Sequence, residues 1–91
     1  MLVALIARDK PDSAAIRAEN RPAHLEYLKD HAAIVAQAGP MLGKDGGMIG
    51  SLIILDVTEM AAANGFAEAD PYAKAGLFSS VELIEWKRVI G

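Results

Sequence analysis

His24 is the side chain of this sequence best suited to acid–base chemistry, because an imidazole exchanges its proton near neutral pH. It stands in "RPAHLEYLKD", residues 21–30, two positions after Pro22. Proline is typical of the first turn of a helix, so we expect a helix to begin there with His24 in its first turn. The positive end of the helix dipole disfavours imidazolium at that position. The pattern is compatible with a neutral base at the rim of a pocket, or with a boundary histidine that is hydrogen-bonded to the backbone.

Asp70 is the type of partner that such a base needs, because a carboxylate holds an imidazole in one tautomer and stabilises its protonated form. Asp70 also precedes Pro71, and this dipeptide is a turn signal. The aspartate is therefore either a partner of His24 or the cap of a short helical turn. His31 lies about 10 Å from His24 along a helix, too far for the two to bind one metal ion. We expect His31 to contact the helix C-terminus, and we expect no metal site.

Three further side chains are candidates for substrate binding. Arg8 and Arg21 can bind an anionic or carbonyl group, although a solvated or ion-paired arginine fits the sequence as well. Tyr72 can donate a hydrogen bond from its hydroxyl into a pocket or simply pack. The glycines of residues 43–50 do not join a strand to a helix, so they indicate a hairpin turn rather than a phosphate-binding loop.

The composition restricts the class of protein. The chain has 91 residues, a net charge of −3 and no cysteine. This length suits one domain, residues 1–91, and the absence of cysteine excludes disulfides and thiol chemistry. There is no cluster of lysine and arginine, no signal peptide and no apolar run near the roughly 18 residues of a membrane span. We therefore expect a cytoplasmic domain whose partners include neither nucleic acid nor membrane.

Strands and helices are predicted to alternate along the chain. Apolar content and alternation predict four strands, at residues 2–7, 33–42, 48–57 and 79–90. Between the first two strands we expect a short helix capped by Asp12 or Ser13 and a second helix that begins at Pro22. Leu25, Leu28 and Ala32 form the apolar stripe of that second helix. Between the last two strands we expect a helix capped by Thr58, followed by a tight turn at Asp70.

This order predicts a ferredoxin-like α+β fold, βαββαβ, with a four-stranded antiparallel sheet and the helices on one face. The other face of the sheet would expose many aliphatic side chains. Soluble monomers rarely expose a large apolar patch. We therefore predict a homodimer in which a second copy covers this face.

Three blocks, "RPAHLEYL", "AGPML" and "ADPYAKAGL", occur in an order and spacing that resemble the YCII-related (YciI-like) family. The similarity covers nearly the whole chain. It implies a ferredoxin-like subunit that pairs in the manner of the dimeric α+β barrels. It also implies a site made by a histidine and an aspartate, which fall at His24 and Asp70 here.

The resemblance implies chemistry similar to proton-transfer elimination on hydroxylated, halogenated aromatic compounds. The sequence carries no cofactor motif, which agrees with this class. We therefore predict a cofactor-independent lyase or isomerase for a small hydroxylated aromatic or carbonyl metabolite, in which His24 moves a proton and Asp70 orients it. The turn at residues 43–47 looks short for the family, so the substrate class does not carry over. The alternatives are a ligand-binding or accessory protein that uses the same pocket without turnover, and a structural interaction module.

Overall fold

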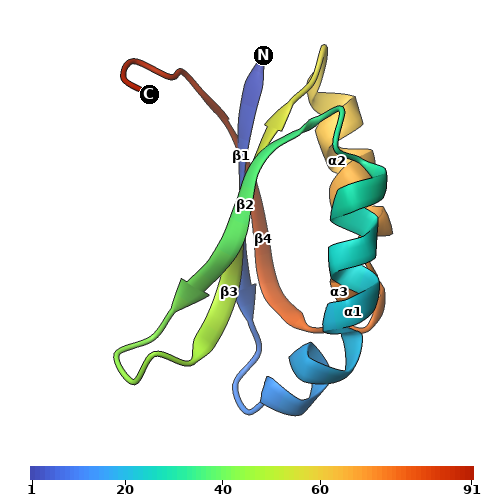
Figure 1. Cartoon of the computed structure of the whole chain (residues 1–91), viewed down its shortest axis with the longest axis vertical. Helices are drawn as coiled ribbons and strands as arrows, with labels where there is room; N and C mark the ends of the chain where they lie inside the picture. Colours follow the sequence, from blue (N-terminus) through green and yellow to red (C-terminus); the bar gives the residue numbers. More distant parts are fainter.

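The computed structural model describes all 91 residues and contains a four-stranded antiparallel sheet with its helices on one face (Figure 1). The strands are β1 (Leu2–Asp9), β2 (Val35–Leu42), β3 (Met48–Asp56) and β4 (Phe78–Trp86), and they lie in the order β2-β3-β1-β4. The helices are α1 (Ala14–Asp30), α2 (Met60–Ala69) and α3 (Pro71–Lys74). The predicted ferredoxin-like α+β fold is confirmed. None of the helices combines the length and hydropathy needed to cross a bilayer.

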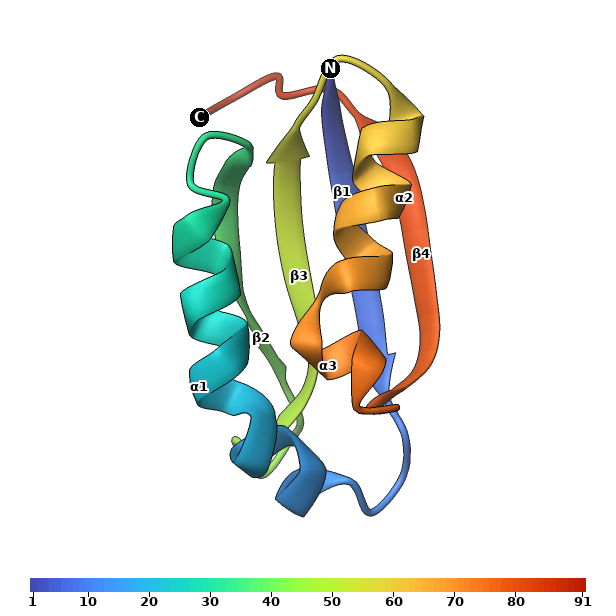
Figure 2. The same cartoon turned by 90° about the vertical axis from the view of Figure 1, so that its right-hand side faces the viewer.

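The hydrophobic core lies between the sheet and the helical layer. Because side chains alternate along a strand, Val3, Leu5 and Ala7 of β1 all face the helices and are buried. The full core cluster is Val3, Leu5, Ala7, Ile53, Leu55, Val57, Ala63 and Phe66. Figure 2 shows α2 and α3 over β1 and β4, and α1 along the β2 side of the sheet. The core is therefore covered mainly by α2. The space between α1 and the sheet is lined by a different set of residues.

The opposite face of the sheet has no helix over it (Figure 1). The register places Ile6 of β1 beside Leu52 of β3, and Ala4 beside both Ile54 and Ile84. Leu52 is 42% exposed and Ile84 is 47% exposed. We call this apolar surface of Ala4, Ile6, Leu52, Ile54, Ile84 and Trp86 the open face.

The prediction that a separate helix begins at Pro22 was wrong. The structure has one helix of 17 residues with Pro22 inside it. Proline has no N–H to donate to the carbonyl of Ala18, and the helix bends in this region (Figure 2). His24 therefore lies within the helix and not in its first turn, so the argument from the helix dipole was wrong.

Three other predicted boundaries were also wrong. Helix α2 begins at Met60, after Glu59, and no side chain caps it, so Thr58 is not its cap. Strand β2 begins at Val35 because Ile34 and Val35 both donate backbone hydrogen bonds to His31, which closes a turn there. Strand β4 ends at Trp86, opposite Leu2, the first residue of β1, and not at residue 90.

Gly50 of β3 lies where two strands approach closely, and we predict that Gly50→Ala destabilises the fold by about 1–3 kcal/mol through overpacking. An added Cβ would collide with the backbone carbonyl of Ala7 and the terminal methyl of Met41. Gly39→Ala in β2 is the matched control, because a Cβ there meets nothing within 4 Å. Urea unfolding of both variants at one protein concentration tests this. Equal unfolding midpoints would contradict the close packing around Gly50.

Candidate active site

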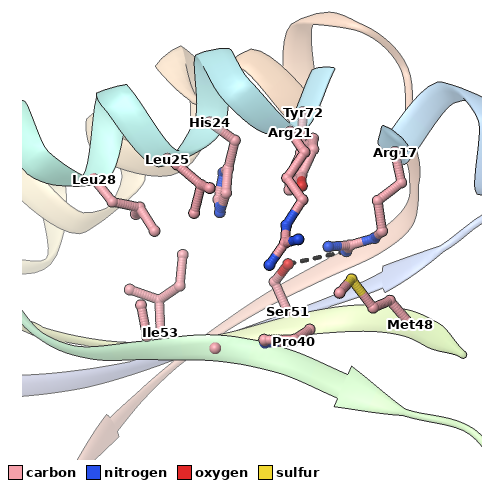
Figure 3. A pocket seen from close by; sticks show the side chains of 12 residues that line it. Arg17, Arg21, His24, Leu25, Leu28, Pro40, Met48, Ser51, Ile53 and Tyr72 are labelled. Carbon is pink, nitrogen blue, oxygen red and sulfur yellow. Dashed lines mark hydrogen bonds between the residues drawn. The ribbon is translucent and has the colours of Figure 1, made fainter. Parts of the chain in front are cut away.

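A cavity of about 170 Å³ lies between α1 and the β2–β3 side of the sheet (Figure 3). Its lining residues are Arg17, Arg21, His24, Leu25, Leu28, Ala38, Gly39, Pro40, Met48, Ser51, Ile53 and Tyr72. A cavity of about 150 Å³ in another protein holds benzene. The size is therefore suited to one small ring.

His24 lines this cavity and forms a buried hydrogen-bonded pair with Asp70, which lies outside the lining. His24 Nδ1 lies 2.9 Å from Asp70 Oδ1, and the two residues are 6% and 2% exposed. The same Asp70 oxygen accepts the backbone N–H of Tyr72 at 2.9 Å and so caps α3. The two roles considered for Asp70 are thus compatible. Because Nδ1 is engaged by the carboxylate, Nε2 is the imidazole nitrogen that is free to meet a ligand.

Tyr72 is fully buried beside this pair. Its ring stacks on the His24 ring with centroids 4.0 Å apart, and Arg17 Cζ lies over the Tyr72 ring at 4.6 Å from its centroid. The Tyr72 hydroxyl makes no hydrogen bond of good geometry, although the nearby Arg17 guanidinium interacts with it. Burial raises the pKa of Tyr72 above its ordinary value, although the charges of Arg17 and Arg21 and the hydrogen-bonding influence of Arg17 oppose the change. The hydroxyl therefore keeps its proton near neutral pH.

Arg17 ties α1 to the sheet and was not predicted as a site residue. Its Nε and Nη2 donate to the Asp9 carboxylate at 2.7 and 2.9 Å, and Nη2 also donates to Ser51 Oγ at 3.0 Å (Figure 3). Burial lowers the pKa of the Arg17 guanidinium, but the hydrogen bond and charge of Asp9, together with Tyr72, raise it above its ordinary value. Arg17 is therefore a fixed positive charge at one end of the cavity.

The face of α1 that is turned towards the sheet carries polar side chains, whereas a helix that packs on a hydrophobic core usually carries aliphatic side chains there. Residues spaced three or four apart share one helix face. Continuous helix through Pro22 therefore aligns four cavity residues, Arg17, Arg21, His24 and Leu28. This spacing was the available signal for Arg17, and the predicted break at Pro22 concealed it.

The predicted apolar stripe of α1 was therefore only partly right. Leu28 packs against the core, but Leu25 is 45% exposed and lines the cavity. Ala32 lies beyond the end of the helix and is exposed.

Only one of the two arginines that the sequence suggested for substrate binding lines the cavity. Arg21 lines the cavity with Tyr72, although it is largely exposed. Arg8 does not line it. The neighbour of Arg8 in β1, Ala7, belongs to the core, so alternation directs Arg8 to the opposite side of the sheet. His31 lies at the end of α1 outside the cavity, with Nδ1 2.8 Å from the Tyr27 carbonyl oxygen.

Comparison with known proteins shows to which family this chain belongs. A model of the YCII-related domain matches residues 1–87. The chain belongs to the YCII-related family. Protein YciI of Escherichia coli O6:H1 is 37% identical, and the match covers 98% of this chain and 99% of that protein. An uncharacterised protein of Haemophilus influenzae is 28% identical over 98% of this chain and 99% of its own length.

Two solved structures resemble this YCII-related chain. The first is 5-chloro-2-hydroxyhydroquinone dehydrochlorinase (TftG) of Burkholderia phenoliruptrix AC1100, in complex with 2,5-dihydroxybenzoquinone. It is 36% identical with a TM-score of 0.89, and the match covers 96% of this chain and 94% of that one. The second, an antibiotic biosynthesis monooxygenase, has a TM-score of 0.53 and 13% identity over 97% of this chain and all of that one, so it supports the fold alone.

Proposed function

We propose that this protein is a cofactor-independent enzyme that moves a proton on a small hydroxylated aromatic or carbonyl compound, with lyase or isomerase chemistry. The observation that carries the proposal is the buried hydrogen bond between Asp70 and His24, which lines a ring-sized cavity. An ionised Asp70 accepts the Nδ1 proton of His24, so Nε2 is left unprotonated and acts as the base. The carboxylate then stabilises the imidazolium that forms when the base takes a proton.

The proposed step is a proton transfer coupled to a change in substrate bonding. His24 Nε2 takes the proton, and the electron pair left behind forms a new π bond in the substrate. In a lyase reaction that π bond forms as a leaving group departs with its own electron pair. In an isomerase reaction the imidazolium returns the proton to another atom of the same substrate. The similarity to a dehydrochlorinase supports the first form, because removal of hydrogen chloride is an elimination of this kind.

The test uses the substrate named for the similar enzyme. The purified protein is mixed with 5-chloro-2-hydroxyhydroquinone, and released chloride is measured against a sample without protein. We expect catalytic chloride release, over many turnovers per chain. Recovery of the unchanged compound bound in a stoichiometric amount would contradict turnover and favour a ligand-binding protein with the same pocket.

We also propose that two copies of the chain pair through the open face. The face has no helix over it, and large aliphatic side chains on it are exposed, such as Leu52 at 42% and Ile84 at 47%. Covering such a patch removes apolar surface from water and stabilises the assembly. The cavity lies on the opposite side of the sheet, so pairing leaves its lining from this chain intact.

Leu52→Arg is expected to convert the dimer to a monomer, because it buries a charge without a partner at the centre of the interface. Leu42→Arg is the matched control, since Leu42 is 60% exposed and pairs with the cavity residue Met48, outside the open face. Sedimentation equilibrium gives the mass of each variant. A Leu52→Arg protein that sediments like wild type would exclude this face as the interface.

A further inference from the structure

We propose that Met48 sets the size limit of the ligand by closing one end of the cavity against a second hollow in the surface. The class of ligand selected in this way is a compound with a single ring, and compounds with two fused rings are disfavoured. The inference rests on the proposed function, because that function requires a ring-shaped ligand in this cavity. It adds a specificity-determining residue that has no part in the proton transfer.

The second hollow lies beside the N-terminal half of α1 and has a volume of about 270 Å³. Its lining residues are Ala14, Arg17, Ala18, Arg21 and Met48. Arg17, Arg21 and Met48 also line the cavity, so these three side chains form the partition between the two spaces. Figure 3 shows Met48 at the opposite end of the cavity from Leu28. Met48 is the part of the partition that the sheet contributes, because the two arginines belong to α1.

An irregularity in β3 turns Met48 towards the helices. Two successive residues of β2 pair with Gly50 and Met48, so Ile49 is an extra residue in β3. Ser51 and Ile53 line the cavity, so regular alternation would direct Met48 to the open side of the sheet. The extra residue reverses the alternation, and Met48 lines the cavity instead. Bulges of this kind re-aim side chains next to functional sites.

Met48 is the apolar and movable part of the partition. Arg17 is held by hydrogen bonds to Asp9 and Ser51, and Arg21 is exposed, with a charged end that favours water. The Met48 side chain is unbranched with three rotatable bonds, and the residue is 36% exposed, so a larger ligand can displace it into water. Displacement costs packing, because the side chain must leave its place against the cavity. The partition therefore weakens the binding of a large ligand and does not block it outright.

The test measures a size preference, defined as the Kd of 2-hydroxy-1,4-naphthoquinone divided by the Kd of 2,5-dihydroxybenzoquinone. The first probe has a second ring fused to its quinone ring, and the second probe has a single ring. Met48→Ala removes the side chain beyond Cβ and joins the two spaces. We expect it to lower the size preference about 10- to 100-fold, the usual range for a change of shape in an apolar pocket. Because the probes also differ in their hydroxyl groups, the ratio is compared between variants and not judged by its absolute value.

Leu42→Ala is the matched control. Leu42 pairs with Met48 across the β2–β3 hairpin, is 60% exposed and lines neither space. The same kind of apolar side chain is thus removed from the same hairpin, and the size preference should equal that of wild type. Met48→Leu is the conservative variant, because it nearly conserves volume, and it should stay within about threefold of the wild-type preference. Circular dichroism establishes that all three variants are folded.

Three results would overturn the inference. The first is an unchanged size preference in Met48→Ala, and the second is an equal loss of preference in Leu42→Ala. The third is that the wild-type protein binds neither quinone, because the cavity would then not be a site for ring compounds.

The inference and the proposed function fail in different ways. If the size preference changes as expected and no chloride is released from 5-chloro-2-hydroxyhydroquinone, the role of Met48 stands and the enzymatic proposal is lost. If chloride is released and Met48→Ala keeps the wild-type size preference, the enzymatic proposal stands and the role of Met48 is wrong.

Discussion

His24→Ala is expected to reduce turnover by about 10²- to 10⁴-fold, the contribution of a positioned general base. The imidazole is held by Asp70 at 2.9 Å and by the Tyr72 ring, so its position is fixed. The rate of chloride release from 5-chloro-2-hydroxyhydroquinone at saturating substrate measures the loss. Added imidazole should restore part of the rate, because the substitution leaves room for a free base beside Asp70.

His31→Ala is the control for this experiment. His31 is the other histidine of the chain and lies at the end of α1, outside the cavity lining. Its replacement should leave turnover within a factor of about two, since loss of a distant base does not alter the reacting groups. A folded His24→Ala protein that keeps the wild-type rate would falsify the role of His24 as base. Circular dichroism of both variants establishes that they are folded.

Arg17→Ala is expected to destabilise the protein by about 3–5 kcal/mol, the usual cost of removing one partner of a buried ion pair. The side chains of Arg17 and Asp9 are 6% and 7% exposed and are joined by two hydrogen bonds. Without the guanidinium, the Asp9 carboxylate is buried with no partner, and Ser51 loses its donor. Guanidinium chloride unfolding at one protein concentration measures the change, because the proposed pairing of chains would also affect apparent stability.

Two further variants distinguish the effect of losing the ion pair from the effect of losing an arginine side chain. Arg21→Ala removes the same side chain from the same helix face, but Arg21 is exposed and is in no ion pair. Its effect should lie within about 0.5 kcal/mol. The double variant Asp9→Leu/Arg17→Leu should be more stable than Arg17→Ala, because no charge is left unpaired. Equal losses in Arg17→Ala and Arg21→Ala would mean that the pair with Asp9 contributes nothing.

The fold could be predicted because its signals are local. The apolar run that became β1 and the long aliphatic segment that became β3 needed no tertiary information. The ends of elements were harder, because they depend on partners. The segment after Trp86 lies outside β4, because Met1, which precedes the paired residue Leu2, bonds to Val57 instead. Pro22 is a similar case, since packing of α1 on the sheet overcomes the local preference of proline for a helix start.

The site was only partly predictable. His24 and Asp70 are 46 positions apart, so their approach is a tertiary event that spacing cannot reveal, and the family resemblance suggested the pair. Arg8 was suggested by residue type alone, and strand alternation then turned it away from the cavity. Arg17 was missed because its alignment with His24 requires a helix that continues through Pro22. That the Tyr72 hydroxyl makes no hydrogen bond of good geometry depends on its surroundings, so no sequence pattern contains it.

The most direct test of the account is the protonation state of the two His24 ring nitrogens, because the proposed base is Nε2. Nitrogen-15 NMR of the imidazole distinguishes the two neutral tautomers, and His31 provides an internal reference. We expect neutral His24 to carry its proton on Nδ1, which donates it to Asp70 in a hydrogen bond. We expect Asp70→Asn to abolish this preference. If His24 carries its proton on Nε2, the nitrogen that faces the ligand is no base, and the proposed proton transfer by the His24–Asp70 pair is wrong.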